Sequence, residues 1–225
     1  MLAKNMALIR SKIELAAGRR GIDAKSVKLI CVTKNANLDR IEEAIGLGLA
    51  DMGENRVQEA VIKHKSIGNK AIWHLIGHLQ TNKVKDAVKI FSLIQSVDSI
   101  RLAREIDSRA REASKIQDIL VEVNISGEDR KFGVAPDAAP NFVKEVSLYP
   151  NIHIAGLMGM APLVENQEDA RVYFKRLKNI FDVLSSMDIA NAEMKWLSMG
   201  MSQDFEVAIE EGSNMVRIGS AIFKE

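Results

Sequence analysis

The stretch KLICVTK, residues 28–34, decides the fold of this chain. It is a short apolar run with β-branched residues and a turn after it, which predicts a buried strand over residues 28–33. Seven further runs of this kind follow, each bounded by Gly, Asp, Asn, Ser or Pro. The eight predicted strands cover residues 28–33, 49–52, 72–76, 91–95, 119–125, 153–158, 196–199 and 215–218.

Amphipathic segments separate the strands, with apolar residues at the three- and four-residue spacing of a helix. Asp39, Ser99 and Asp137 suit N-terminal helix positions, where short polar side chains are favoured. The predicted helices cover residues 38–47, 56–66, 81–88, 99–114, 137–148, 168–186 and 204–210.

Strands that alternate with helices indicate parallel pairing through right-handed crossovers. A closed barrel and an open doubly wound sheet both satisfy this order, and the eight evenly spaced strands favour a TIM-type (β/α)8 barrel. Only SAIFKE follows the last strand, so we expect an N-terminal helix over residues 2–18 to complete the outer ring. Without a linker or repeat, residues 1–225 are expected to form a single domain.

The composition limits the possible partners. Lys and Arg number 31 and Asp and Glu 30, so the net charge of +1 indicates neither nucleic acid nor an anionic membrane as a partner. The lone Cys31 excludes an intramolecular disulfide and a multi-cysteine metal site. The sequence has no signal-peptide or membrane-spanning pattern, and we expect a cytoplasmic protein.

Lys34 stands at the carboxyl end of the first predicted strand, where barrels of this type carry their chemistry. Because side chains alternate along a strand, Ile30, Val32 and Lys34 share one face, and Cys31 packs on the other. If the first face points inward, Lys34 loses hydration at the barrel mouth, which favours the neutral amine that attacks an aldehyde. On position alone, a solvated lysine that opens a loop is the simpler interpretation.

Two loops rich in small residues follow the seventh and eighth predicted strands: SMGMSQD at 198–204 and RIGS at 217–220. Loops at these places frequently bind phosphate in this fold. Gly219 allows a close approach of backbone N–H groups, and Ser202 and Ser220 add hydroxyl donors. Arg217 adds a charge-assisted hydrogen bond. Each loop alone is explained by an ordinary turn with Ser202 as a helix cap, but both loops with Lys34 indicate a phosphorylated aldehyde.

At these residues the sequence resembles the YggS/PROSC family of pyridoxal phosphate-binding proteins, also called PLP homeostasis proteins. The matching segments occur in order from the first strand to the end of the chain. They are VTKNANL around Lys34, DMGENRVQEA at 51–60, WHLIGHLQTNKVK at 73–85, IQSVDS at 94–99, VEVNISGEDRKFGV at 121–134, GLMGMAP at 156–162 and LSMGMSQDFEVAIEEGSNMVRIGSAIF at 197–223.

The resemblance implies a barrel like the N-terminal domain of alanine racemase, with pyridoxal 5′-phosphate (PLP) held as a Schiff base on Lys34. It implies a non-catalytic protein that binds PLP for vitamin B6 and amino-acid homeostasis, with PLP-dependent apoenzymes as recipients. We expect a monomer, because the C-terminal domain of the racemases is missing, and we expect no bound metal. The cofactor-binding residues that it implies are Lys34, Asn55, Ser202, Arg217, Gly219 and Ser220.

Two features depart from the pattern of many relatives. Ala36 stands where they carry a second lysine, and the sequence stops at Glu225 where they continue with a lysine-bearing tail. Lys131 does match a family lysine. If such lysines relay or unload the cofactor, we expect this chain to do so less readily.

Two other functions stay open at this level. A Schiff-base enzyme of racemase or aldolase type would use Lys34 as a nucleophile, and a phosphosugar- or nucleotide-binding barrel would use only its charge. A racemase of the similar fold also needs a tyrosine base. The only tyrosines, Tyr149 and Tyr173, are predicted away from the strand carboxyl ends, which argues against a racemase.

Overall fold

The computed structural model describes residues 1–128 and 130–224. Parallel strands close into a barrel in chain order, and β8 pairs with β1. This closure confirms the predicted TIM-type (β/α)8 barrel and excludes the open sheet. The strands are β1 (Lys28–Val32), β2 (Asp51–Glu54), β3 (Ile72–Leu75), β4 (Leu93–Val97), β5 (Gln117–Val123), β6 (Ile152–Gly159), β7 (Ala192–Ser198) and β8 (Met215–Ile218).

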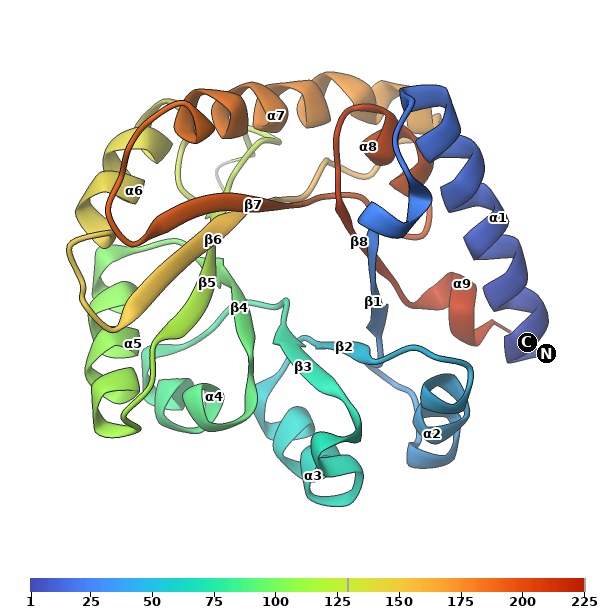
Figure 1. Cartoon of the computed structure of the whole chain (residues 1–225), viewed down its shortest axis with the longest axis horizontal. Helices are drawn as coiled ribbons and strands as arrows, with labels where there is room; N and C mark the ends of the chain where they lie inside the picture. The colour runs from blue at the N-terminus through green and yellow to red at the C-terminus, as the bar shows by residue number, and fades with distance from the viewer. Residues whose placement is uncertain (129, 225) are drawn as a thin grey trace.

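Helices surround the barrel as an outer layer (Figure 1). Three of the predicted helices begin with a 3-10 turn, at Thr81–Lys83, Pro136–Ala138 and Gln167–Ala170. No helix within the described residues is long and apolar enough to span a membrane. The helices are α1 (Leu2–Arg20), α2 (Leu38–Gly46), α3 (Val57–Ile67), α4 (Val84–Ile90), α5 (Ile100–Glu112), α6 (Ala139–Val146), α7 (Arg171–Ser185), α8 (Phe205–Glu210) and α9 (Ser220–Phe223).

The helix starts follow their expected chemistry in part. Ser99 caps α5, with its hydroxyl accepting a hydrogen bond from the N–H of Leu102 at 3.4 Å. Asn37 caps α2, so Asp39 lies in the first turn, where an acidic side chain is favoured by the helix dipole. Asp137 lies in the 3-10 turn that precedes α6.

Two strands begin and end two residues later than predicted, whereas β5 begins and ends two residues earlier. The predicted strand 49–52 is β2 at Asp51–Glu54, because the chain is still turning at Gly48, where φ is 85°. The predicted strand 91–95 is β4 at Leu93–Val97, because the N–H of Phe91 still bonds to the Ala87 carbonyl of α4.

Helix α1 fills the gap in the outer ring, as predicted, by packing against α8 and α9 (Figure 1). The side-chain amide of Asn5 donates to the carbonyl oxygens of Ile222 and Lys224 at 3.0 and 2.9 Å. Lys12 lies 2.7 Å from Glu206 of α8 in an ion pair. The first helix of the chain is thereby tied to the last two.

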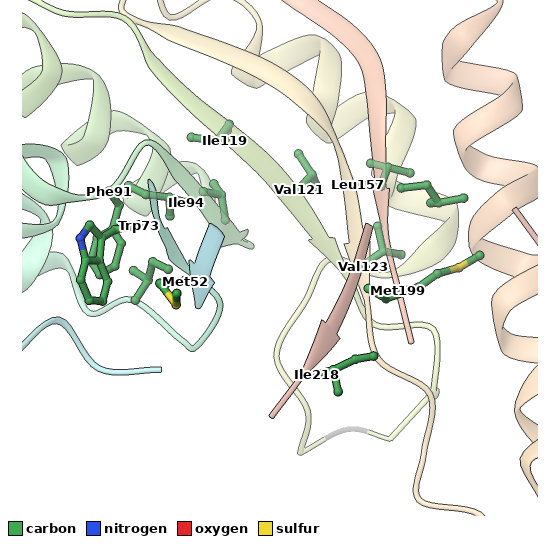
Figure 2. Close-up of a cluster of buried hydrophobic side chains, with 14 of the residues drawn as sticks. Met52, Trp73, Phe91, Ile94, Ile119, Val121, Val123, Leu157, Met199 and Ile218 are labelled. Atoms are coloured by element: carbon green, nitrogen blue, oxygen red, sulfur yellow. The ribbon is translucent and has the colours of Figure 1, made fainter. Parts of the chain in front are cut away.

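Alternating side chains divide the apolar core into two layers. Ile30 belongs to a cluster drawn from five strands, and such a cluster forms only inside the barrel. Cys31 points the opposite way into the layer between strands and helices, where burial raises the pKa of its thiol to about 12. The predicted facing of β1 is therefore confirmed. Figure 2 shows part of the outer layer, in which Met52, Trp73 and Phe91 lie together.

We predict that Ile9→Ala in α1 lowers the free energy of unfolding by about 2–4 kcal/mol, because a buried side chain is replaced by a cavity. Ile9 is 3% exposed, whereas its neighbour Leu8 is 59% exposed. Leu8→Ala is the matched control and should change stability by less than about 0.5 kcal/mol. Urea denaturation measures both, and equal losses would contradict the packing of α1 described above.

Candidate functional site

The carboxyl ends of the barrel strands surround a cavity of about 910 Å³. This is the end of the barrel at which the chemistry of the fold is located. The structure brings together in its lining all six residues selected from the sequence: Lys34, Asn55, Ser202, Arg217, Gly219 and Ser220.

Lys34 lies two residues beyond β1, at the mouth of the cavity. Val32 lines the same cavity, in agreement with the predicted shared face. Asn35 takes a left-handed conformation with φ 65°, and the N–H of Ala36 closes the turn on the carbonyl of Thr33 at 2.9 Å. The predicted loss of hydration is wrong, because the Lys34 side chain is exposed to solvent where the barrel opens.

The loops after β7 and β8 are joined to each other and to β1. The hydroxyl of Ser202 accepts a hydrogen bond from the N–H of Ala221 at 3.4 Å. A Cβ atom on Gly219 would lie 2.9 Å from the carbonyl oxygen of Val32, so only glycine allows this loop to pack so closely on β1. Both loops are consequently placed beside the strand that precedes Lys34.

Ser202 does not cap α8, as the simpler interpretation of this loop would have it. Asp204 is the cap residue, and its Oδ1 accepts a hydrogen bond from the N–H of Met201 at 2.6 Å. Burial raises the pKa of Asp204 from its ordinary value, although this hydrogen bond and Arg217 act in the opposite direction. The Ser202 side chain thus remains part of the cavity lining.

Arg217 is buried in β8, with 3% of its surface exposed. Its guanidinium donates to Ser198 Oγ at 2.5 Å and to the carbonyl of Gly159 at 3.1 Å. Burial lowers the pKa of Arg217 to about 10, and the charges of Glu122 and Asp204 oppose the shift. At neutral pH the cavity floor therefore carries a fixed positive charge.

A chain of hydrogen bonds continues from Arg217 across the inside of the barrel. Ser198 donates to Gln95 Oε1 at 2.7 Å, and Gln95 Nε2 lies 3.5 Å from His74 Nδ1. His74 Nε2 lies 2.8 Å from Asp51 Oδ1. The amide nitrogen of Gln95 can only donate, so Nδ1 of His74 is the acceptor in this contact. This chain of hydrogen bonds inside the barrel thereby orients the Arg217 guanidinium from the side opposite the cavity mouth.

Sequence reasoning missed one wall of the cavity, the loop at residues 160–167 after β6. Leu163 in this loop is 86% exposed. The loop carries no charged pair or glycine-rich turn that would single it out. The rule that every loop after a strand lines the mouth of such a barrel could have found it.

Other polar residues near the strand ends lie outside the cavity lining. His78 stacks on Phe132 with ring centroids 3.7 Å apart and lies 3.7 Å from Asp98. Lys131 pairs with Glu128 at 2.5 Å. Within the described residues, no group of three or more His, Cys, Asp or Glu side chains is placed to hold a metal ion.

The fold and the lysine-bearing cavity define the class, a barrel of the type that forms the N-terminal domain of alanine racemase. The family model "Alanine racemase, N-terminal domain" matches residues 9–225. An alanine racemase from Clostridium difficile shares the fold with a TM-score of 0.73 at 15% identity, and the match covers 100% of this chain and 56% of that one.

Closer relatives narrow the class to one family. A pyridoxal phosphate homeostasis protein from Aquifex aeolicus is 40% identical over 99% of this chain and 97% of its own length. The Escherichia coli protein of the same name is 36% identical over 99% and 95%. PipY of Synechococcus elongatus, solved with PLP bound, has a TM-score of 0.86 and 32% identity over 99% of this chain and 100% of its own. This chain belongs to the pyridoxal phosphate homeostasis protein family.

We predict that Glu122→Gln makes the protein more stable at about pH 8 but not at about pH 4. Burial raises the pKa of Glu122 from 4.5 to about 7; the charge of Asp98 adds to the rise and that of Arg217 opposes it. Between these values the folded state binds more protons than the unfolded state. The stability that this group contributes is therefore full below pH 4.5 and is lost as the pH rises through 7.

The expected gain at pH 8 is on the order of 3 kcal/mol, from the size of the shift. Urea denaturation at both pH values measures it. Glu145→Gln is the control, because Glu145 is exposed on α6. A Glu122→Gln gain that is the same at both pH values would contradict the assignment.

Proposed function

We propose that residues 1–225 form one domain that binds pyridoxal 5′-phosphate through Lys34 and serves PLP homeostasis without a reaction of its own. The names of the relatives and the PLP-bound structure of PipY support this function. The observation that carries it is the cavity in which Lys34 faces the loops after β7 and β8.

The residues present fit the cofactor. The hydroxyls of Ser202 and Ser220 suit a phosphate group, and among the described residues their N–H groups donate to no protein acceptor. Backbone N–H groups without partners and a nearby guanidinium are the usual ligands of an anion. Arg217 supplies that charge, and Asn55 adds an amide to the lining.

Lys34 would hold the other end of the cofactor. When bound, pyridoxal 5′-phosphate supplies an aldehyde that a primary amine can attack. Among the described residues, Lys34 is the lysine that lines the cavity. Its exposure at the mouth leaves the amine within reach of a cofactor that enters from solvent.

A racemase-like enzyme is the second candidate, and the placement of the tyrosines speaks against it. Tyr149 lies between α6 and β6, and Tyr173 lies in α7. Neither lines the cavity, so neither can serve as the second base that a racemase places opposite its lysine.

We further propose that the chain works as a cytoplasmic monomer and that PLP-dependent apoenzymes receive the cofactor from it. The single buried Cys31 suits a reducing compartment. The open cavity mouth suits exchange, because no part of the barrel has to unfold for PLP to leave.

The first test is covalent labelling. We predict that the wild-type protein, mixed with PLP and reduced with borohydride, carries a pyridoxyl group on Lys34, identified by mass spectrometry. Lys34→Ala should lose the label and the visible absorbance of the bound cofactor. Lys85→Ala, at an exposed lysine of α4 outside the cavity, should keep both. A colourless wild type that takes up no PLP would instead favour the phosphosugar-binding barrel.

The second test concerns delivery. If lysines near the mouth relay the cofactor, Ala36→Lys should speed transfer of PLP from the loaded protein to an apoenzyme. Lys131→Ala should slow the transfer, and recovery of apoenzyme activity measures both rates. Indistinguishable rates for the two variants and the wild type would rule out a relay by these lysines.

A further inference from the structure

A buried ion pair lies directly behind Lys34, on the side away from the cavity. Lys63 of α3 places Nζ 2.6 Å from Glu54 Oε1 at the end of β2. The Glu54 side chain is fully buried and that of Lys63 is 12% exposed. Neither residue lines the cavity, so the pair does not contact a ligand there.

The pair acts on the residue before Lys34. Thr33 has three polar groups, and each is held by a neighbouring element. Its N–H donates to the Gly53 carbonyl at 3.0 Å, and its hydroxyl donates to Glu54 Oε1 at 2.5 Å. Its carbonyl oxygen accepts a hydrogen bond from Lys63 Nζ at 2.8 Å. The peptide that leads into Lys34 is therefore fixed to β2 and α3.

The arrangement is costly as a source of stability alone. Burying two charges removes their hydration, and their mutual attraction often does no more than offset that cost. Glu54 Oε2 is also buried and finds no hydrogen-bond partner among the described residues. Such an oxygen lowers stability. The value of the pair is thus to be sought in the geometry that it imposes.

That geometry concerns a flexible side chain. A lysine carries its amine on a flexible four-carbon chain. The amine therefore reaches a defined point only if the backbone directs the Cα–Cβ bond toward it. The hydrogen bonds to Thr33 fix the backbone before Lys34, and the left-handed conformation of Asn35 fixes it afterwards. The fixed backbone on both sides thereby limits the directions in which the side chain can leave the main chain.

We propose that Lys63 and Glu54 are positioning residues for Lys34: they fix the Thr33 peptide so that the amine is directed toward the loops after β7 and β8. This inference rests on the proposed function, because a fixed Lys34 serves a protein that bonds a cofactor to it. The pair acts through Thr33 and touches no substrate or cofactor.

The experiment measures the rate at which visible absorbance develops after mixing with PLP, the lysine that carries the pyridoxyl label, and the free energy of unfolding. Lys63→Met should slow the reaction at Lys34 by about 10- to 100-fold, because small displacements of reacting groups have effects of this size. Lys63→Arg should restore most of the rate, since a guanidinium can donate to both oxygens that Lys63 holds.

A double variant separates the effect of the Thr33 position from the effect of an unpaired buried charge. Lys63→Met alone leaves the buried Glu54 unpaired, so part of its effect is lost stability. Lys63→Met with Glu54→Gln removes both charges and should recover much of that stability. The rate should stay low, because the Thr33 carbonyl has lost its hydrogen bond to α3 and keeps only the one from the N–H of Ala36.

Lys115→Met is the matched control. Lys115 is also half-buried and donates to main-chain carbonyls, those of Val88 and Phe91 at 2.9 and 3.4 Å. It precedes β5 and so lies at the opposite end of the barrel. Its replacement should lower stability and leave the rate at Lys34 unchanged.

The outcomes distinguish this inference from the proposed function. A wild type without label on Lys34 overturns both. A labelled wild type with wild-type rates in Lys63→Met or in the double variant overturns only the positioning role. The same holds if Lys115→Met slows labelling as much as Lys63→Met does. A slow double variant beside a fast Lys115→Met establishes the role.

Discussion

The pairing of the last strand with the first is the interaction on which the rest of the structure depends. Leu29 pairs with Val216 and Cys31 with Ile218, so β8 lies in register beside β1. This register brings Gly219 against Val32, and with it the loops after β7 and β8 to the mouth where Lys34 lies. Residues from opposite ends of the sequence share one cavity only because the sheet closes. An open sheet of the same strands would separate the lysine from its candidate anion ligands.

Closure also creates an enclosed interior that is apolar in one part and polar in another. Ile30 and its partners fill the apolar part, while the chain from Asp51 through His74, Gln95 and Ser198 reaches Arg217. A buried guanidinium is tolerable where its donors are satisfied and acidic groups lie near. Ser198, Gly159 and Glu122 meet those needs. The cavity floor is therefore buried and linked by hydrogen bonds, whereas its mouth, with Lys34 and Leu163, is open to solvent.

Much of this architecture could be predicted from local sequence patterns. Strand β8 has the predicted bounds, 215–218, and the six selected residues line one cavity because barrel topology determines where loops meet. The displacement of β2 arose at Gly48, whose left-handed turn ends α2 through local hydrogen bonds, such as that from the N–H of Leu49 to the Ala44 carbonyl, which the apolar pattern does not show. The Lys63–Glu54 pair could not be foreseen, since a lysine at an ordinary helix position gives no sign that it will be buried. The hydration of Lys34 likewise depends on how far the surrounding loops extend above the barrel mouth. The apolar periodicity of the sequence does not show this.

The attachment of α1 has a consequence for biosynthesis. Met6, Ile9 and Ile13 are among the buried residues of this helix, which packs against α8 and α9. Those two helices leave the ribosome only after almost all of the barrel has been translated. The apolar side of α1 is thus synthesised long before the helices that cover it, and for that interval it is exposed to chaperones and to other unfinished chains.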